Sequence, residues 1–275
     1  MIEIGQYNEL TILRDTSVGL YLGDDSGEDV LLPNKYRPEK FELGDSIEVF
    51  VYRDHEERKV ATNLTPKITL NEFALLQVTS VTEVGAFLDW GLDKDLFVPF
   101  AEQHRPMEVG KSYIVHLYLD VKGRITASSK IDKFLQDDGA STFRPRQRVS
   151  LIIANSTDLG YKVIVNHTHW GVLYKDEVFE RLSFGQSKQG FIKRIRPDGR
   201  LDITLHGGKE TKDKNAAKVL EYLKTHNGTA PLHDKSPPAE IEAQLAMSKA
   251  AFKKAISSLY KERVIIIEKD GIRLV

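Results

Sequence analysis

The sequence of 275 residues contains no cysteine. Disulfide bonds, thiolate metal sites and cysteine nucleophiles are therefore excluded, and a reducing cytoplasm is the compartment that we expect. No apolar run approaches the ~20 residues of a membrane-spanning helix, and the run at 264–267 is among the longest. The N-terminal residues 1–4 lack the basic and apolar segments of a secretory signal. We expect neither membrane insertion nor secretion.

Motifs of catalytic sites are also missing. The sequence has no P-loop, no dinucleotide-binding glycine motif and no serine nucleophile elbow. His167 and His169 would place two imidazoles on one side of a strand, but no thiolate or evident acidic third ligand accompanies them. We interpret both as surface groups, and the segment 206–209 as a linker. The sequence thus predicts no enzymatic activity, no metal and no cofactor.

Charge is distributed unevenly along the chain. Residues 1–70 carry 8 lysines and arginines against 14 acidic residues, and residues 71–142 carry 7 against 11. Residues 143–214 carry 14 against 8, and residues 215–275 carry 10 against 7. An acidic first half and a basic second half predict that a polyanion binds to the second half.

One pattern occurs three times in the chain. In each repeat a first glycine is followed 25 residues later by a second, with a short apolar run between them. A β-rich run, a turn and a last strand follow the second glycine, which gives about five short strands per unit. Five such strands suit a small closed barrel of the OB type. A continuous β-sandwich is the alternative, but it needs no repeated interval of equal length. The glycine pairs are Gly19 and Gly44, Gly85 and Gly110, and Gly160 and Gly185.

The second repeat resembles the S1 RNA-binding domain, and the equal spacing extends the resemblance to the other two repeats. S1 domains are OB barrels that bind single-stranded RNA by stacking bases on aromatic rings and holding phosphates with lysine and arginine. The segments that carry the resemblance are Gly-Ala-Phe-Leu at 85–88, Leu-Phe-Val-Pro-Phe-Ala-Glu at 96–102, Val-Gly-Lys at 109–111 and Gly-Arg-Ile at 123–125.

Residues 215–275 differ in character from the repeats. Apolar residues at helical spacing in 216–223, a Ser-Pro-Pro helix start at 236–238 and an apolar stripe in 252–260 predict three helices. The runs 264–267 and 272–275 flank an Asp-Gly turn, which predicts a hairpin. Three helices and a hairpin make a winged helix.

Three S1-like units followed by a winged helix resemble the bacterial conserved virulence factor B family, and residues 247–261 are similar to that family's tail motif. The resemblance implies a cytoplasmic RNA-binding protein with a regulatory role and no known catalytic activity. The predicted fold is mainly β, with three tandem S1-like OB-fold barrels and an α+β winged-helix domain. The expected domains are 1–66, 67–139, 140–210 and 211–275.

The resemblance also indicates where RNA contacts belong. Typical S1 domains have an aromatic before the first glycine, another two residues after it, a histidine on the next strand and a basic residue on the last strand. The first slot holds no aromatic in this chain, and alternation along the strand predicts that Phe87 points out of its barrel. The occupants in repeat order are Val18, Val84 and Leu159; Tyr21, Phe87 and Lys162; Pro33, Pro99 and Tyr174; and Lys59, Arg124 and Arg200.

The third repeat combines cations and aromatics, as single-strand binders do. Tyr174 can stack a base, and Lys162 and Arg200 can contact phosphates. Further cations occur in two groups, and the first of these alternates at strand spacing, which predicts that its members line one side of a strand. The groups are Arg144, Arg146 and Arg148, and Lys193, Arg194 and Arg196.

On the third predicted helix, Lys249, Lys253 and Lys261 share one face. This face is interpreted either as a recognition surface for nucleic acid or as a solvated lysine face. The favoured function is non-catalytic binding of single-stranded RNA by the third barrel and the winged helix, in a post-transcriptional or virulence-type regulator. Two alternatives stay open: a winged-helix DNA-binding regulator, and an adaptor whose acidic barrels dock a protein. The predicted RNA contacts are Phe87, Arg124, Lys162, Tyr174, Lys193, Arg194, Arg196, Arg200, Lys249 and Lys253.

Overall fold

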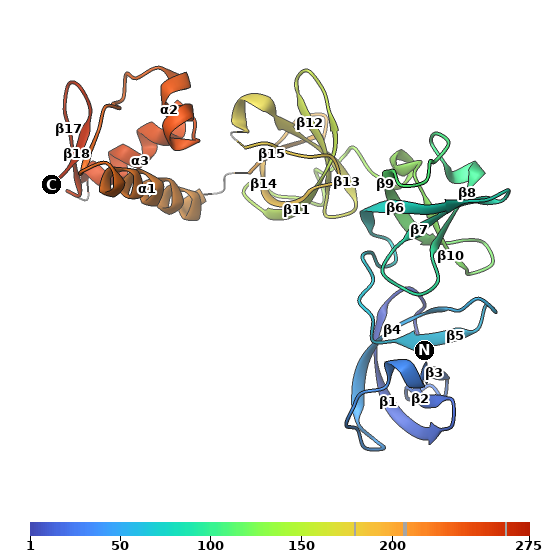
Figure 1. The fold of residues 1–275 in the computed structure, drawn as a ribbon. Helices are drawn as coiled ribbons and strands as arrows, with labels where there is room; N and C mark the ends of the chain where they lie inside the picture. Colours follow the sequence, from blue (N-terminus) through green and yellow to red (C-terminus); the bar gives the residue numbers. More distant parts are fainter. Residues whose placement is uncertain (179, 206–207, 262) are drawn as a thin grey trace. The chain divides into compact units, whose positions relative to one another are not determined.

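The structure is a computed structural model that describes residues 1–178, 180–205, 208–261 and 263–275 (Figure 1). The chain forms two compact units, Met1–Leu135 and Gln136–Val275. The predicted linker at 206–209 is only partly described: its first two residues lie outside the described ranges, and its last two already belong to a helix.

The first barrel is a closed cylinder of five strands in the order β1-β2-β3-β5-β4. β3 and β5 pair in parallel, and the other neighbours are antiparallel. Alternate side chains point inward, so Leu20 and Leu22 are buried while Tyr21 between them is half-exposed. The strands are β1 (Tyr7–Thr16), β2 (Gly19–Gly23), β3 (Asp29–Pro33), β4 (Ser46–Arg53) and β5 (Lys59–Thr62), and the 3₁₀ helix η1 (Asn34–Tyr36) follows β3.

The second barrel repeats this plan in the sheet order β10-β9-β6-β7-β8. β8 and β10 approach each other, so the sheet curls into a nearly closed cylinder. Phe87 is half-buried between the fully buried Ala86 and Leu88, which confirms that it points out of the barrel. The elements are β6 (Phe73–Val81), β7 (Gly85–Asp89), β8 (Leu96–Pro99), η2 (Phe100–Glu102), β9 (Ser112–Leu119), β10 (Ile125–Ser128) and η3 (Ile131–Phe134).

The third barrel is closed and has the strand order of the first, β11-β12-β13-β15-β14. β13 and β15 form its parallel pair. The elements are β11 (Arg148–Ser156), β12 (Gly160–Val165), β13 (His169–Tyr174), η4 (Lys175–Glu177), β14 (Ser187–Ile195) and β15 (Leu201–Thr204).

Two predictions for the third repeat are wrong. β11 begins only at Arg148; Arg144 accepts a turn hydrogen bond from Gln147, and Arg146 has φ +69°, so these arginines do not alternate along one strand. His167 lies in a turn with φ +58°, whereas His169 is buried and packs edge-on against Phe143. With 3% exposure His169 is not a surface group, and its burial lowers its pKa.

The equal spacing of the glycines in the three repeats has a steric cause. A Cβ atom at Gly19 would lie 2.1 Å from the carbonyl oxygen of Leu32 on the paired strand, and the corresponding distances at Gly85 and Gly160 are 2.4 and 2.3 Å. The second glycine of each repeat has φ of +96°, +81° and +75°, which side chains disfavour. Each barrel thus needs glycine at the same two places, and the interval between them is fixed by the barrel.

The C-terminal region has the three helices and the hairpin that the sequence predicts. Helix α1 ends where Gly228 donates its N–H to the Leu223 carbonyl over 2.7 Å, with Asn227 and Gly228 at positive φ. Helix α2 begins with a proline at its first position. The elements are α1 (Gly208–Thr225), β16 (Thr229–Ala230), α2 (Pro238–Leu245), α3 (Lys249–Lys261), β17 (Ile265–Ile267) and β18 (Ile272–Leu274), with sheet order β16-β18-β17.

The fold is therefore mainly β, with three S1-like OB barrels and a C-terminal winged helix, as predicted. α1 begins before the domain limit expected at 211. In the described part of the chain, no helix combines the length and the apolar character needed to span a bilayer.

Candidate nucleic-acid interface

Tyr174, in the histidine slot of the third repeat, is the last residue of β13. Its neighbour Leu173 is fully buried, so the half-buried Tyr174 ring lies on the outer surface of the barrel. Its hydroxyl lies 3.2 Å from Asp202 Oδ1 and donates to it, and the same hydroxyl accepts a hydrogen bond from the Arg196 guanidinium over 2.5 Å. The ring is thus held in place by polar contacts at its tip.

Asp202 on β15 joins the neighbouring cations. Only 1% of its side chain is exposed, yet it accepts hydrogen bonds from Arg194 Nε and Nη2 at 3.0 and 2.6 Å and from Arg196 Nε at 2.7 Å. Burial acts to raise the pKa of Asp202, but the hydrogen bonds from the two guanidinium groups outweigh it, and the pKa lies below its usual range. One carboxylate against two guanidinium groups leaves one positive charge in excess.

Lys193 completes this arrangement. Its ammonium forms an ion pair with Glu177 and lies 5.8 Å from the centroid of the Tyr174 ring, while the Arg196 guanidinium lies 6.0 Å from it. We refer to Tyr174, Lys193, Arg194, Arg196 and Asp202 as the Tyr174 cluster. The structure thus brings together four of the predicted RNA contacts.

Lys162 shares the outer surface with this cluster. Lys162 on β12 pairs with Val172, Val172 pairs with Asp202, and Asp202 pairs with Arg194, which places these residues in one row across four strands. The Lys162 ammonium lies 3.7 Å from the centroid of the Trp170 ring. Its charge is therefore held against the surface of the barrel by a cation–π contact.

Three further predicted contacts lie outside the cluster. Arg200, in the turn before β15, lies 3.7 Å from the Asp198 carboxylate and is 60% exposed. On α3, Lys249 donates to the Lys235 carbonyl over 3.2 Å, while Lys253 is exposed.

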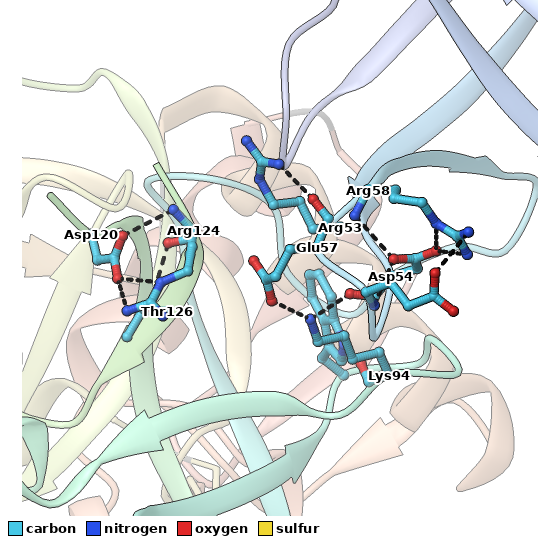
Figure 2. Close-up of polar contacts among 10 residues, drawn as sticks. Arg53, Asp54, Glu57, Arg58, Lys94, Asp120, Arg124 and Thr126 are labelled. Atoms are coloured by element: carbon cyan, nitrogen blue, oxygen red, sulfur yellow. Dashed lines mark hydrogen bonds and ion pairs between the residues drawn. The ribbon is translucent and has the colours of Figure 1, made fainter. Parts of the chain in front are cut away.

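In the second barrel, Arg124 is paired within its own turn. Its Nε and Nη2 donate to Asp120 Oδ2 at 2.8 and 2.6 Å (Figure 2). The hydrogen bonds from Arg124 lower the pKa of Asp120 to about 2. Phe87 faces Phe97 on the adjacent strand, with ring centroids 5.2 Å apart. The structure therefore separates the charged and aromatic contacts predicted for this barrel into different local environments.

The residue predicted for the basic position of the first repeat, Lys59, is wrong by one residue. In all three barrels the turn before the last strand is closed by a backbone hydrogen bond, which the carbonyl oxygens of Arg58, Arg124 and Arg200 accept over 3.0, 2.9 and 2.9 Å. Arg58, not Lys59, is thus the equivalent of Arg124. Arg58 also pairs with an aspartate four residues earlier, Asp54, as Arg124 does (Figure 2).

Glu57 explains the misalignment. It has φ +62° at the position where the other two repeats have glycine with φ +70° and +80°. Its carboxylate accepts a hydrogen bond from the Lys94 ammonium of the second barrel over 2.9 Å, and Lys94 also donates to the Asp54 carbonyl over 2.7 Å (Figure 2). The turn of the first barrel thus binds Lys94 in a loop of the second barrel.

Apolar contacts strengthen this junction. Phe50 and Tyr52 of the first barrel pack edge-on against Trp90 of the second, with ring centroids 5.8 and 6.4 Å apart, and all three rings are buried in one core. In the adjacent loop, Asp93 accepts a hydrogen bond from the Tyr36 hydroxyl over 2.7 Å. The first two barrels are therefore joined by a continuous hydrophobic core.

Comparison with known proteins agrees with this architecture. A family model described as an S1 domain matches residues 4–64 and 72–130, and one described as a CvfB-like winged helix domain matches residues 217–274. YitL of Bacillus subtilis is 31% identical over 267 residues, which cover 94% of this chain and 89% of YitL. Conserved virulence factor B of Staphylococcus epidermidis is 28% identical over 272 residues, covering 90% and 87% of the two chains. The chain belongs to the conserved virulence factor B family.

A solved structure also aligns with this member of the conserved virulence factor B family. It is a multidomain protein with nucleic acid binding domains from Streptococcus pneumoniae, 23% identical, aligned over 99% of this chain and 98% of its own with a TM-score of 0.41. S1 and winged-helix domains are nucleic-acid-binding modules. The family is accordingly of the nucleic-acid-binding type and not of a known enzyme class.

Sequence reasoning missed Asp202. It is a carboxylate between two core residues, Leu201 and Ile203, in the middle of a four-residue strand. A carboxylate at such a place needs a cationic partner, and Arg194 and Arg196 precede it by one hairpin. The alternation of Asp202 with core residues was visible in the sequence, but acidic residues had been considered only for their contribution to net charge.

Proposed function

We propose that this protein binds single-stranded RNA, mainly through its third barrel and its winged helix, and acts as a cytoplasmic, non-catalytic regulator of gene expression after transcription. The observation that carries the proposal is the Tyr174 cluster, in which a half-buried ring lies beside two cations on the outer surface of a closed barrel. Base stacking on an aromatic ring, with phosphates held by neighbouring cations, is how OB folds bind single strands.

The charge of the second unit supports the proposal. Residues 143–275 carry 24 lysines and arginines against 15 acidic residues. Arg144, Arg146 and Arg148 are exposed at the entrance to β11. Such an excess attracts a polyanion from solution and makes its binding dependent on salt.

The winged helix is proposed to extend the RNA surface. The exposed side chains of α3 include Lys253, Tyr260 and Lys261, and Tyr260 follows Lys253 by seven residues, which is about two helical turns. An aromatic ring between lysines repeats, on a helix, the combination found in the third barrel. The predicted contacts of Phe87 and Arg124 stay predictions, and the acidic first unit makes them less favourable for phosphate.

The four domain limits given by the sequence are retained as part of the proposal. The name conserved virulence factor B, carried by relatives in Staphylococcus, supports a regulatory role of the virulence type for this chain.

The proposal is tested by a fluorescence-anisotropy titration of the full chain with a labelled oligouridylate, the matching single-stranded DNA and a DNA duplex, at about 50 and 200 mM salt. We expect the oligouridylate to bind most tightly, with an affinity that falls steeply with salt. Tighter binding of the duplex would instead support a winged-helix DNA regulator. Absence of binding to all three would contradict the proposal.

A further inference from the structure

The outer surface of the second barrel carries two aromatic rings beside a carboxylate. Phe87 on β7 pairs with Phe97 on β8, and both rings are half-buried. Asp95 comes directly before β8, two residues before Phe97. The Thr79 hydroxyl donates a hydrogen bond to Asp95 Oδ2 over 2.7 Å and lies 3.0 Å from the Phe87 carbonyl oxygen, so the carboxylate lies close to the backbone of β7 at Phe87.

The first barrel has an arginine at the same place. Arg14 on β1 lies over the Tyr21 ring of β2, with 4.0 Å from the guanidinium carbon to the ring centroid. The same guanidinium lies 2.7 Å from Asp29 Oδ2 at the start of β3. One arginine of the chain therefore contacts an aromatic ring and a carboxylate at once.

Strand register shows that the two places are equivalent. Tyr21 follows the first glycine of its repeat by two residues, as Phe87 does, and Asp29 precedes the strand-ending proline by four, as Asp95 does. Arg14 pairs with Tyr21 directly after a β-bulge, and Ser80 pairs with Phe87 directly after the same bulge in the second barrel. Ser80 is thus the equivalent of Arg14. The second barrel keeps the ring and the carboxylate and lacks the arginine.

The charges around this surface favour a cation. Within the described ranges Asp95 forms no ion pair, whereas the neighbouring Asp89 is paired with Lys67 over 2.5 Å. A phosphate chain would meet unneutralised carboxylate here, and like charges repel.

We propose that the surface formed by Phe87, Phe97 and Asp95 binds an arginine side chain from a basic segment of a partner protein. The planar guanidinium stacks on an aromatic face and forms paired hydrogen bonds with a carboxylate, which a lysine ammonium does not. Arg14 in the first barrel shows the stacked guanidinium, with one hydrogen bond to a carboxylate, within the same chain. The inference goes beyond RNA binding, because it gives the acidic unit a protein partner of its own.

The test uses the full chain and a fluorescein-labelled peptide of alternating glycine and arginine, with an alternating glycine–lysine peptide for comparison. We expect the arginine peptide to bind at least about fivefold more tightly than the lysine peptide. Ser80→Arg places the arginine of the first barrel into the second and should block the peptide. Asp95→Asn changes almost no volume and should weaken binding about fivefold or more.

Asn155→Arg is the matched control. Asn155 is the residue of the third barrel that pairs with Lys162 directly after the bulge, so this variant adds the same charge at the equivalent position. It should leave peptide binding unchanged. Arg14→Ser, which empties the equivalent place in the first barrel, should add a second binding site of similar affinity.

Two results would overturn the inference. The first is equal binding of the arginine peptide to the parent chain and to folded Ser80→Arg and Asp95→Asn variants, with melting temperatures as the check on folding. The second is absence of peptide binding to the parent chain, whether or not Phe87→Ala loses oligouridylate affinity. If it does, the surface belongs to RNA.

Discussion

The Arg196 guanidinium donates a hydrogen bond to the Tyr174 hydroxyl over 2.5 Å. The aromatic residue of the cluster is thereby hydrogen-bonded to the cation beside it, and both are hydrogen-bonded to the buried Asp202. The ring and the charge are therefore preorganised together, which reduces the loss of side-chain conformational entropy on RNA binding. Replacing the ring, the cation or the carboxylate should have separable effects.

Tyr174→Ala should cost roughly 1–3 kcal/mol of oligouridylate affinity, the range for losing one base–aromatic stack. Tyr174→Phe keeps the ring and loses only the hydroxyl, so it should retain most of the affinity. Anisotropy titrations of both variants, with melting curves to establish folding, make the comparison. Parental affinity in a folded Tyr174→Ala protein would contradict the stacking role.

Arg194→Ala should lower the slope of log affinity against log salt by about 0.7, the value for one phosphate contact on a single strand. The side chain of Arg194 is 67% exposed despite its ion pair, whereas that of Arg196 is 23% exposed. Lys188→Ala, which removes another cation of β14 that is paired with Glu180, is the control. An unchanged slope in Arg194→Ala would show that this guanidinium does not contact phosphate.

Asp202→Asn should destabilise the third barrel by about 1–3 kcal/mol, because the buried site would then hold two guanidinium groups without a carboxylate. The same variant gains positive charge on the RNA surface, so the salt slope should become steeper. Urea unfolding measures the first effect and anisotropy the second. Asp158→Asn, at an exposed residue of the same barrel, should change neither stability nor slope appreciably.

Low pH should lower the free energy of unfolding of the first unit through Asp120. The pKa of Asp120 is about 2 in the folded chain, below the value of about 3.9 in an unfolded chain. A depressed pKa stabilises the fold fully above the unfolded value and loses that effect as the pH falls through the folded value. The melting temperature should therefore fall between about pH 5 and pH 2. Asp120→Asn should flatten this dependence, and the exposed Asp25→Asn should not. Equal pH profiles in all three proteins would refute the assignment.

Separating the two units should separate the functions. A fragment of residues 1–135 should bind oligouridylate about tenfold or more weakly than the full chain, roughly 1.4 kcal/mol, because it lacks the basic unit. A fragment of residues 136–275 should keep most of the affinity. Full RNA affinity in the first fragment would show that the charge gradient does not locate the site.

Much of the fold could be predicted from the sequence because its requirements are local. A carbonyl oxygen of the opposite strand leaves no room for a Cβ at Gly19, Gly85 or Gly160, so glycine spacing reports the barrel directly. The same approach failed where another residue adopts the conformation that glycine adopts elsewhere. Glu57 does so in the first repeat, and the slot assigned to Lys59 belongs to Arg58.

The site was harder to predict because its contacts join separate strands. Tyr174, Arg194 and Arg196 were identified by their residue types, but nothing local shows that they meet at Asp202. The aromatic pair Phe87 and Phe97 likewise forms only across a ladder. Pairing of strands, rather than residue type, decides which charges remain available to a ligand.

The shared core around Trp90 makes the first two barrels thermodynamically dependent on each other. A fragment that ends after the first barrel would expose the Phe50 and Tyr52 rings, which are now almost completely covered. These barrels should therefore unfold in a single cooperative calorimetric transition, although each has the length of an independent domain. An insertion or exchange of one S1-like repeat would have to preserve its neighbour's surface as well as its own interior.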